Sequence, residues 1–230
     1  MKQPLVSFVI RTKNEQKYIA KVVNLLYSQS YENIEIIVVD SGSKDETIPI
    51  VKKLPVKLIQ IKPEEFTYGH ALNVGIDEAK GKTIGIVSGH SIPINNEWLE
   101  NGLKHFDNVK VAAVTGPYSE NPLGYENQTA YKNDPALVGR IQHRYKYLTN
   151  TNSLIRKSLW NDYKFDEKLA ECEDYDWAAE MLSRGFDVVK DPKFGVFHCH
   201  SLLGRPGYWE RIKGWDKITK EIDLKRSKLK

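Results

Sequence analysis

The sequence predicts an α/β fold with a Rossmann-like, mostly parallel sheet flanked by helices. Short, β-branched and nearly continuous apolar runs recur in the first half of the chain, as in "LVSFVI" at 5–10 and "IEIIVVD" at 34–40. Such runs are typical of strands that are buried on both faces. Segments with apolar residues at helical spacing lie between them. This alternation predicts βαβ units with parallel strands and right-handed crossovers.

The elements follow in order along the chain. A first helix is expected in 15–29, and its apolar face would carry Ile19, Val22, Val23 and Leu26. The stretches Thr12–Glu15 and Ser43–Glu46 each fit a capping box at the start of a helix. Further apolar runs predict strands at 56–61, 82–88, 109–116, 186–191 and 194–201.

The second half of the chain is less regular. Residues 117–147 are polar and aromatic and predict an irregular connection. A helix is expected in 173–184, where Gly185 would end it. In 207–229, apolar residues recur on one helical face among many lysines, at Trp209, Ile212, Trp215, Ile218 and Ile222. Neither a repeat nor a linker interrupts the chain, so we expect a single domain over 1–230.

Composition excludes several classes of protein. Of 230 residues, 40% are hydrophobic and 28% charged, and the net charge is +4, which is ordinary for a globular domain without a dense basic run for nucleic acid. This mild charge favours a phosphate-bearing substrate or an anionic membrane surface. Two cysteines without a C-x-x-C pattern argue against a disulfide framework or structural zinc. The apolar run near the start is too short for a signal peptide, so we expect a cytoplasmic location.

Polar residues follow three of the predicted strands at Arg11–Glu15, Asp40–Ser43 and Ser88–His90. In an open parallel sheet, ligands bind outside the carboxyl ends of the strands. Neither G-x-G-x-x-G nor G-x-x-x-x-G-K-[ST] occurs in the sequence, which argues against dinucleotide dehydrogenases and P-loop enzymes.

Several stretches together resemble one family. They are "VSFVIRTKNE…IEIIVVDSGSKDET", "ALNVGIDEAKGKTIGIVSGH", "NTNSLIRKSLW" and "ECEDYDWAAEMLSRGFDVVKDPKFGVFHCHS". The chain thereby resembles family 2 glycosyltransferases with the GT-A fold over about 1–116 and 149–201. Within that family it is most similar to bacterial polysaccharide or rhamnosyltransferase-like members. The resemblance implies a nucleotide-sugar-binding half at 1–116 and an acceptor and catalytic half at 117–205. The helical spacing of apolar residues adds a C-terminal amphipathic helix at 206–230.

The resemblance implies a binding site for a nucleoside diphosphate sugar. Asp40 would bind the base, since a carboxylate accepts an N–H; otherwise it caps a strand end. The other implied donor-binding residues are Thr12, Asn14, Glu15, Ser41, Ser43, Asn73 and Ser88. Ser43 equally fits a helix N-cap. The family often has an arginine where this chain has Leu72, so His70 or Lys13 would have to supply that phosphate contact.

The resemblance also implies a catalytic pair, Glu173 and Asp174. Asp174 would be the general base of an inverting transfer, because the acceptor hydroxyl must lose its proton as it attacks. Glu173 would position the base or the acceptor. An alternative is that the acids at 171, 173, 174 and 176 merely favour a helix N-terminus. Trp177, on the same helix, is more readily explained as core than as a sugar-stacking surface.

The family's D-x-D motif holds Mg²⁺ or Mn²⁺, and here Ser88 and His90 occupy the acidic positions. In one interpretation His90 is a metal ligand together with His198 or His200, which favours Mn²⁺ over Mg²⁺. In a second, protonated His90 neutralises the diphosphate without metal. In a third, the site is degenerate. A divalent metal is the implied cofactor, with metal-independent transfer as the alternative.

The function predicted from these motifs is transfer of a sugar from a nucleoside diphosphate donor to a hydroxyl acceptor, a glycan or a lipid-linked sugar. The alternative is a catalytically silent GT-A module that binds sugar nucleotides or serves as a scaffold. Residues 207–229 predict a helix that packs on the core, and the alternative is a peripheral contact with the inner face of the membrane.

Overall fold

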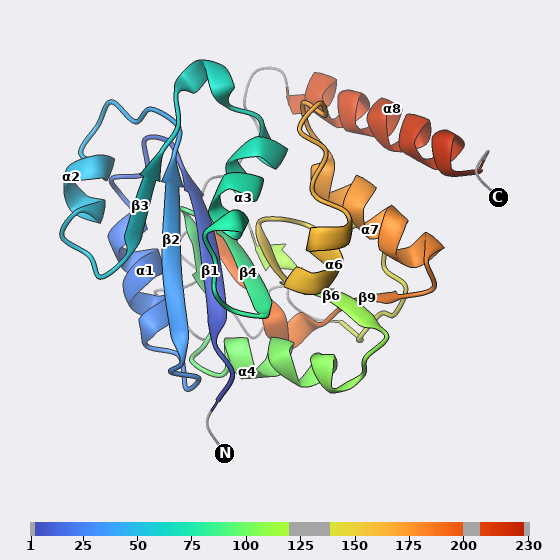
Figure 1. Cartoon of the computed structure of the whole chain (residues 1–230), viewed down its shortest axis with the longest axis horizontal. Coiled ribbons are helices and arrows are strands. Elements are labelled where there is room, and N and C mark those ends of the chain that lie inside the picture. Colours follow the sequence, from blue (N-terminus) through green and yellow to red (C-terminus); the bar gives the residue numbers. More distant parts are fainter. Residues whose placement is uncertain (1–2, 120–138, 200–207, 228–230) are drawn as a thin grey trace.

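In this computed structural model, residues 3–119, 139–199 and 208–227 are described, and they form a seven-stranded sheet covered by helices on both faces (Figure 1). The strand order is β3-β2-β1-β4-β8-β6-β9. The strands are β1 Val6–Thr12, β2 Ile34–Asp40, β3 Lys57–Gln60, β4 Thr83–Ser88, β6 Val111–Thr115, β8 Asn152–Arg156 and β9 Asp187–Lys190. Neighbouring strands are parallel except at β8, which is antiparallel to both β4 and β6. The predicted fold class is confirmed.

A second, three-stranded sheet has the order β5-β10-β7 and consists of β5 Ser91–Pro93, β10 Val196–His198 and β7 Tyr118–Ser119. It extends from the end of β4, because β5 begins three residues after Ser88. In its register His198 lies opposite Ser91. This small sheet therefore brings the end of the chain's last predicted strand next to the turn at 88–90.

The helices are α1 Ile19–Tyr27, α2 Thr47–Val51, α3 Tyr68–Asp77, α4 Trp98–Leu103, α6 Lys157–Asp162, α7 Glu173–Ser183 and α8 Tyr208–Ser227, with short 3₁₀ turns at Pro63–Glu65, Lys104–Asp107 and Pro192–Phe194. Neither predicted capping box forms. Helix α1 begins at Ile19 and α2 at Thr47, and no side chain caps either helix. The reason is that the Thr12 and Ser43 hydroxyls hydrogen-bond to Asp40 instead.

Gly185 ends α7 as predicted. Its φ of +85° is a conformation that glycine adopts without strain. The N–H of Gly185 donates to the carbonyl of Leu182, and the N–H of Phe186 donates to that of Met181. These two bonds form a Schellman motif, which satisfies carbonyls at the end of the helix.

Alternate residues of β1 serve the two faces of the sheet, as the pleat requires. Phe8 and Ile10 pack on the side of α1 and α4, whereas Val9 packs on the side of α3 and α7. Trp177 of α7 is fully buried on this second side, so its interpretation as a core residue holds. Arg11, next on that side of β1, lies where the core gives way to a cavity.

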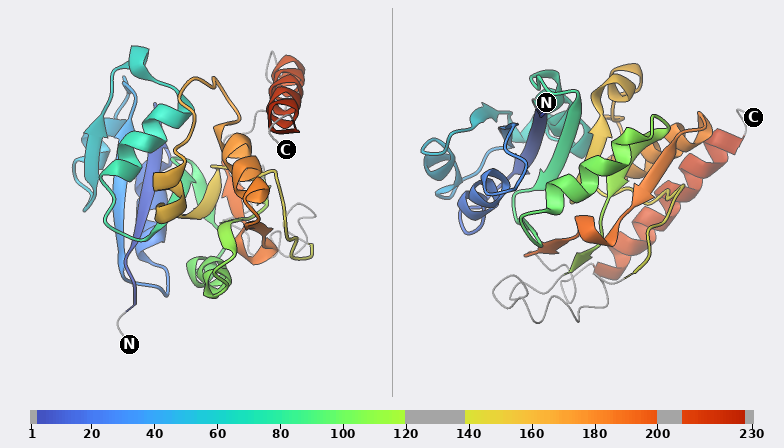
Figure 2. Two further views of the ribbon diagram at one scale, coloured as in Figure 1. Left: turned by 45° about the vertical axis from the view of Figure 1, so that its right-hand side comes forward. Right: turned by 90° about the horizontal axis from the view of Figure 1, so that it is seen from below.

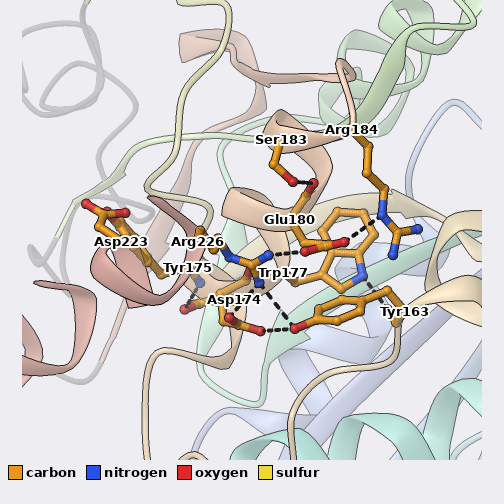
Figure 3. Close-up of polar contacts among 10 residues, drawn as sticks. Tyr163, Asp174, Tyr175, Trp177, Glu180, Ser183, Arg184, Asp223 and Arg226 are labelled. Carbon is orange, nitrogen blue, oxygen red and sulfur yellow. Dashed lines mark hydrogen bonds and ion pairs between the residues drawn. The ribbon is translucent and has the colours of Figure 1, made fainter. Parts of the chain in front are cut away.

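Helix α8 packs beside α7, as Figures 1 and 2 show. Arg226 of α8 forms an ion pair with Glu180 of α7, and its guanidinium also donates to the Tyr163 hydroxyl (Figure 3). It forms a second ion pair with Asp176 of α7. Ile222 is buried, whereas Trp209 is 67% exposed and lies outside the packed face. The predicted packing of this helix therefore forms without Trp209. None of the helices described here is long and apolar enough to cross a bilayer.

Candidate active site

A cavity of about 870 Å³ opens at the carboxyl ends of β1 and β4, between these strands, α7, α8 and the second sheet. It brings together residues that lie far apart in the sequence. Of the predicted site residues, those that line it are Ser88, His90, Glu173, Asp174 and His198. His200 lies outside the described residues.

The structure assigns different partners to the four acids near the start of α7. Glu171 pairs with Arg211 and accepts a hydrogen bond from Trp215. Asp176 faces away from the cavity and pairs with Arg226. Glu173 and Asp174 line the cavity. Glu171 also lines the cavity, but its carboxylate is paired with Arg211. The acids are thus not an undifferentiated charged helix end, since the predicted catalytic pair occupies the first two helical positions and lines the cavity, whereas Asp176 does not.

The carboxylate of Asp174 is fixed by the backbone. It accepts the N–H of Asn150 at 3.0 Å and the N–H of Tyr175 at 2.8 Å. Burial, together with the nearby charge of Glu173, raises the pKa of Asp174 from 3.8 to about 7. A carboxylate whose pKa lies near the working pH is suited to general base catalysis, because it is substantially ionised and still accepts a proton readily.

Cys172 precedes this pair and has a φ of 67°, which is uncommon outside glycine. Burial raises the pKa of its thiol to about 12, so the thiol is a poor nucleophile. The cysteine therefore has a conformational role at the turn that leads Glu173 and Asp174 into the cavity.

His90 lies between a carboxylate and a second imidazole. Its Nδ1 is 2.7 Å from Glu15 Oε1, and its Nε2 is 2.9 Å from His198 Nε2. A carboxylate accepts hydrogen bonds, so the Glu15 contact fits a tautomer with the proton on Nδ1. A hydrogen bond between the two Nε2 atoms requires a proton on one of them.

These residues fit a divalent metal on the chemistry of their atoms. Two nitrogens at about 2.1 Å from an ion and at right angles are about 3 Å apart, close to the separation of the two Nε2 atoms. Glu15 holds the other ring nitrogen of His90, as carboxylates commonly do for metal-bound histidines. The fit concerns these two histidine nitrogens alone, because among the described residues no group of three or more His, Cys, Asp or Glu could hold an ion. A protonated His90 would make the same two contacts, so both interpretations stay open.

The two predicted donor loops are joined to each other rather than to the cavity. The Asn14 side chain accepts from the N–H of Lys44, and the N–H of Asn14 donates to Ser43 Oγ. Asp40 is fully buried and accepts four hydrogen bonds, from the Thr12 and Ser43 hydroxyls and from the N–H groups of Gly42 and Ser43. Asp40 thus orders this loop, and its contact with a base stays a prediction that requires exchange of one of these bonds.

Ser41 and Asn73 also lie away from the cavity. The Ser41 hydroxyl donates to the carbonyl of Thr12. Asn73 Nδ2 donates to the Phe165 carbonyl and to Glu167, and its Oδ1 accepts from Trp160 Nε1. The amide of Asn73 therefore fixes the loop after α6, and its contact with a donor stays a prediction.

The two residues considered as replacements for the family's arginine are not near the cavity wall. His70 pairs with Glu167 at 3.0 Å, and Lys13 is exposed. Leu72 is completely buried. The cavity instead contains two arginines that sequence reasoning missed, Arg11 and Arg211. A charged residue at the end of the apolar run "VSFVI" is the signal that could have identified Arg11.

Aromatic side chains form another wall of the cavity that the sequence did not reveal. Tyr145, Tyr147 and Tyr175 form a chain of ring contacts, with centroids 5.8 and 5.5 Å apart, and Trp215 of α8 adds to the lining. Aromatic rings with polar tips suit a ligand that is apolar on one face and hydroxylated at its edges.

Comparisons with known proteins agree with this geometry. The sequence model of the family described as Glycosyl transferase family 2 matches residues 7–164. The chain is 24% identical over 214 residues to the O-antigen chain rhamnosyltransferase RfbN of Salmonella typhimurium, which covers 87% of this chain and 68% of that protein. It is 37% identical over 181 residues to the uncharacterized glycosyltransferase RP339 of Rickettsia prowazekii, which covers 75% of this chain and 57% of that protein.

Solved structures share the fold. The mannosyltransferase PcManGT from Pyrobaculum calidifontis, in complex with GDP-Man and Mn²⁺, has a TM-score of 0.70 at 20% identity and covers 88% of this chain and 59% of that one. TarS 1–349 of S. aureus, in complex with UDP-GlcNAc, has a TM-score of 0.65 at 20% identity and covers 84% of this chain and 57% of that one. The chain thus spans somewhat over half the length of these two proteins.

Proposed function

The chain belongs to glycosyltransferase family 2, and we propose that it is an inverting enzyme that transfers a sugar from a nucleoside diphosphate donor to a hydroxyl group. The observation that carries the proposal is Asp174, a backbone-held carboxylate in the cavity whose pKa is raised to about 7. The relatives named as transferases of glycan biosynthesis support a glycan or lipid-linked sugar as acceptor.

In the proposed reaction, Asp174 accepts the proton of the acceptor hydroxyl while the hydroxyl oxygen forms a bond to the anomeric carbon. The bond between this carbon and the diphosphate oxygen breaks on the opposite face, and the nucleoside diphosphate leaves. The N–H groups of Asn150 and Tyr175 keep the carboxylate in one orientation. The charge of Glu173 helps to keep the pKa of Asp174 high, so that Asp174 is a stronger base than an ordinary aspartate.

His90 and His198 would hold a divalent ion, with Glu15 orienting His90. Such an ion would offset the charge that develops on the leaving diphosphate. The Mn²⁺ of the structurally similar mannosyltransferase supports metal use. A silent module is the less well supported alternative, since it gives no reason for a carboxylate with a raised pKa to lie in the cavity. Cytoplasmic location and a peripheral membrane contact of 207–229 stay predictions.

A panel of UDP-, GDP- and dTDP-sugars tests the proposal through release of the nucleoside diphosphate, first with water and then with simple sugars as acceptors. We expect turnover with at least one donor, and a loss of about 10²–10⁴-fold in the Asp174→Asn variant. Asp162→Asn is the matched control, because Asp162 is an exposed carboxylate at the end of α6 and outside the cavity lining. Equal rates in Asp174→Asn and the control would contradict the role of the base.

A further inference from the structure

Arg11 is a buried cation whose hydrogen-bonding capacity is incompletely used. It lies on β1 next to Ser88 of β4 in the parallel register, and both side chains line the cavity. Its side chain is 15% exposed, and its Nη1 is buried without a hydrogen-bond partner among the described residues. The nearest charged partner, Glu173 Oε1, is 3.9 Å away, beyond hydrogen-bond distance. Because orphaned buried donors are rare in folded proteins, this one calls for a ligand.

The guanidinium is held in place by its neighbours. Its centre is 4.7 Å from the centroid of the Tyr68 ring. The Tyr68 hydroxyl accepts a hydrogen bond of 3.1 Å from Arg211 Nη2, and Arg211 is paired at 2.7 Å with Glu171. A stacked guanidinium with a fixed neighbour is preorganised, so a ligand binds without the cost of ordering the side chain.

We propose that Arg11 binds the diphosphate of the sugar nucleotide and so supplies the fixed cation that this chain lacks at Leu72. The assignment rests on the proposed function. A guanidinium matches phosphate oxygens in geometry and charge and stays protonated. Arg11 adjoins Ser88, at the strand end where the leaving group is expected, and a cation there stabilises the charge that develops on this group. Ser88, which is neutral where the family resemblance implies an acid, leaves the guanidinium free of a competing carboxylate from β4.

An alternative role for Arg11 is that of a counter-ion for Glu173. The distance of 3.9 Å to Glu173 fits a weak ion pair, and that pair would affect the ionisation of the carboxylates rather than the affinity for phosphate. A second source of phosphate is the acceptor, if it carries a phosphoryl group. The affinities of separate probes distinguish these roles.

The test uses the 230-residue chain in the presence of EDTA, so that divalent ions do not contribute to binding. Calorimetric titrations compare UDP, GDP and dTDP with the corresponding nucleosides, inorganic pyrophosphate and glycerol 3-phosphate. For the diphosphate that the unmodified chain binds, and for pyrophosphate, we expect Arg11→Gln to weaken binding at least about tenfold. We expect Arg11→Lys to lose less, and the affinity for the nucleoside to stay within twofold in both variants.

Arg184→Gln is the matched control, since Arg184 lies at the C-terminal end of α7, outside the cavity lining, and pairs with Glu180. Circular dichroism and thermal unfolding establish that each variant is folded. A diphosphate affinity of Arg11→Gln within twofold of the control overturns the proposal, and so does a loss confined to glycerol 3-phosphate, which would assign Arg11 to the acceptor. If no nucleotide binds but pyrophosphate binds and depends on Arg11, the proposed donor is wrong and the phosphate site stands. If no probe binds in EDTA, the Arg11 proposal fails, and the proposed function is decided separately by the donor panel with metal present.

Discussion

Replacement of Glu173 by glutamine is expected to shift the pH dependence of the reaction. Glu173 is one of the two causes that raise the pKa of Asp174, and burial is the larger one. Glutamine keeps the shape of the side chain and an oxygen that can accept from Asn150 Nδ2, as Glu173 Oε1 does at 3.1 Å. The substitution therefore removes a charge and little else. The pKa of Asp174 should fall below about 7 but stay above 3.8, because the burial remains.

The magnitude follows from the ionised fraction of the base. With a pKa of about 7, about one-tenth of Asp174 is ionised at pH 6 and about nine-tenths at pH 8. If ionised Asp174 is the base, kcat/KM should rise about ninefold over this interval. A fall of about one in the pKa would leave about half ionised at pH 6, so the rise in Glu173→Gln should be only about twofold.

The assay is release of the nucleoside diphosphate from an accepted donor, measured as kcat/KM from pH 5 to pH 9, because this parameter reports the ionisations of the free enzyme. The chain without substitution should lose activity as the pH falls through about 7, and Glu173→Gln should lose it at a lower pH. An acid limb centred near 4 in the unsubstituted chain would refute the raised pKa. An unchanged or higher limb in Glu173→Gln would refute the role of Glu173.

Four further outcomes are expected. If His90 is a metal ligand, His90→Ala should abolish Mn²⁺ binding measured by electron paramagnetic resonance. If protonated His90 itself neutralises the diphosphate, the chain without substitution should already show no dependence on metal. Asp174→Asn should raise the free energy of unfolding at pH 8 by about 1–2 kcal/mol, with no gain near pH 4. The pKa of Asp174 rises from 3.8 in the unfolded chain to about 7 in the folded protein, so ionisation of this carboxyl destabilises the folded protein as the pH increases over that window. Arg226→Met should cost about 3–5 kcal/mol in urea unfolding, because the buried carboxylate of Asp176 loses its ion-pair partner, while Glu180 keeps Arg184. Trp177→Ala should cost about 3–5 kcal/mol, because the ring is fully buried.

Three of these outcomes have a contrary result that would refute them. Mn²⁺ binding that persists in His90→Ala would exclude this ligand, and His143→Ala, an exposed histidine, is the comparison. An Asp174→Asn variant that is less stable at pH 8 would contradict the cost of the buried charge. Amide exchange of α8 that is unchanged in Arg226→Met would show that the ion pairs do not hold this helix on α7.

The strands of the sheet were predictable because their apolar runs are long and β-branched, as at 5–10 and 34–40. Strand β8 was not, because Asn152–Arg156 is a five-residue run with polar residues at both ends, and its antiparallel place between β4 and β6 depends on contacts distant in sequence. The capping boxes failed because both hydroxyls donate to the buried carboxylate of Asp40. Thr12 reaches it from the neighbouring strand, and Ser43 reaches it from three residues along the chain.

The site was predictable where it follows strand ends. His90 follows β4, and His198 reaches it because β10 pairs antiparallel with β5, the strand that begins directly after His90. Helical position alone does not reveal that Asn73 hydrogen-bonds to the loop of Phe165, and its contact with a donor stays a prediction. Arg11 was missed because its importance depends on two features that a linear sequence does not reveal. Its Nη1 is buried without a hydrogen-bond partner among the described residues, and its guanidinium lies over the Tyr68 ring.

Proton NMR of the reaction with the sugar nucleotide panel tests the central claim most directly, since it follows both turnover and the configuration of the sugar first released. The account predicts that at least one nucleoside diphosphate sugar is cleaved with inversion at the anomeric carbon, and that Asp174→Asn slows this at least about 100-fold. Retention of configuration, absence of cleavage for every donor, or an undiminished rate in Asp174→Asn would contradict it.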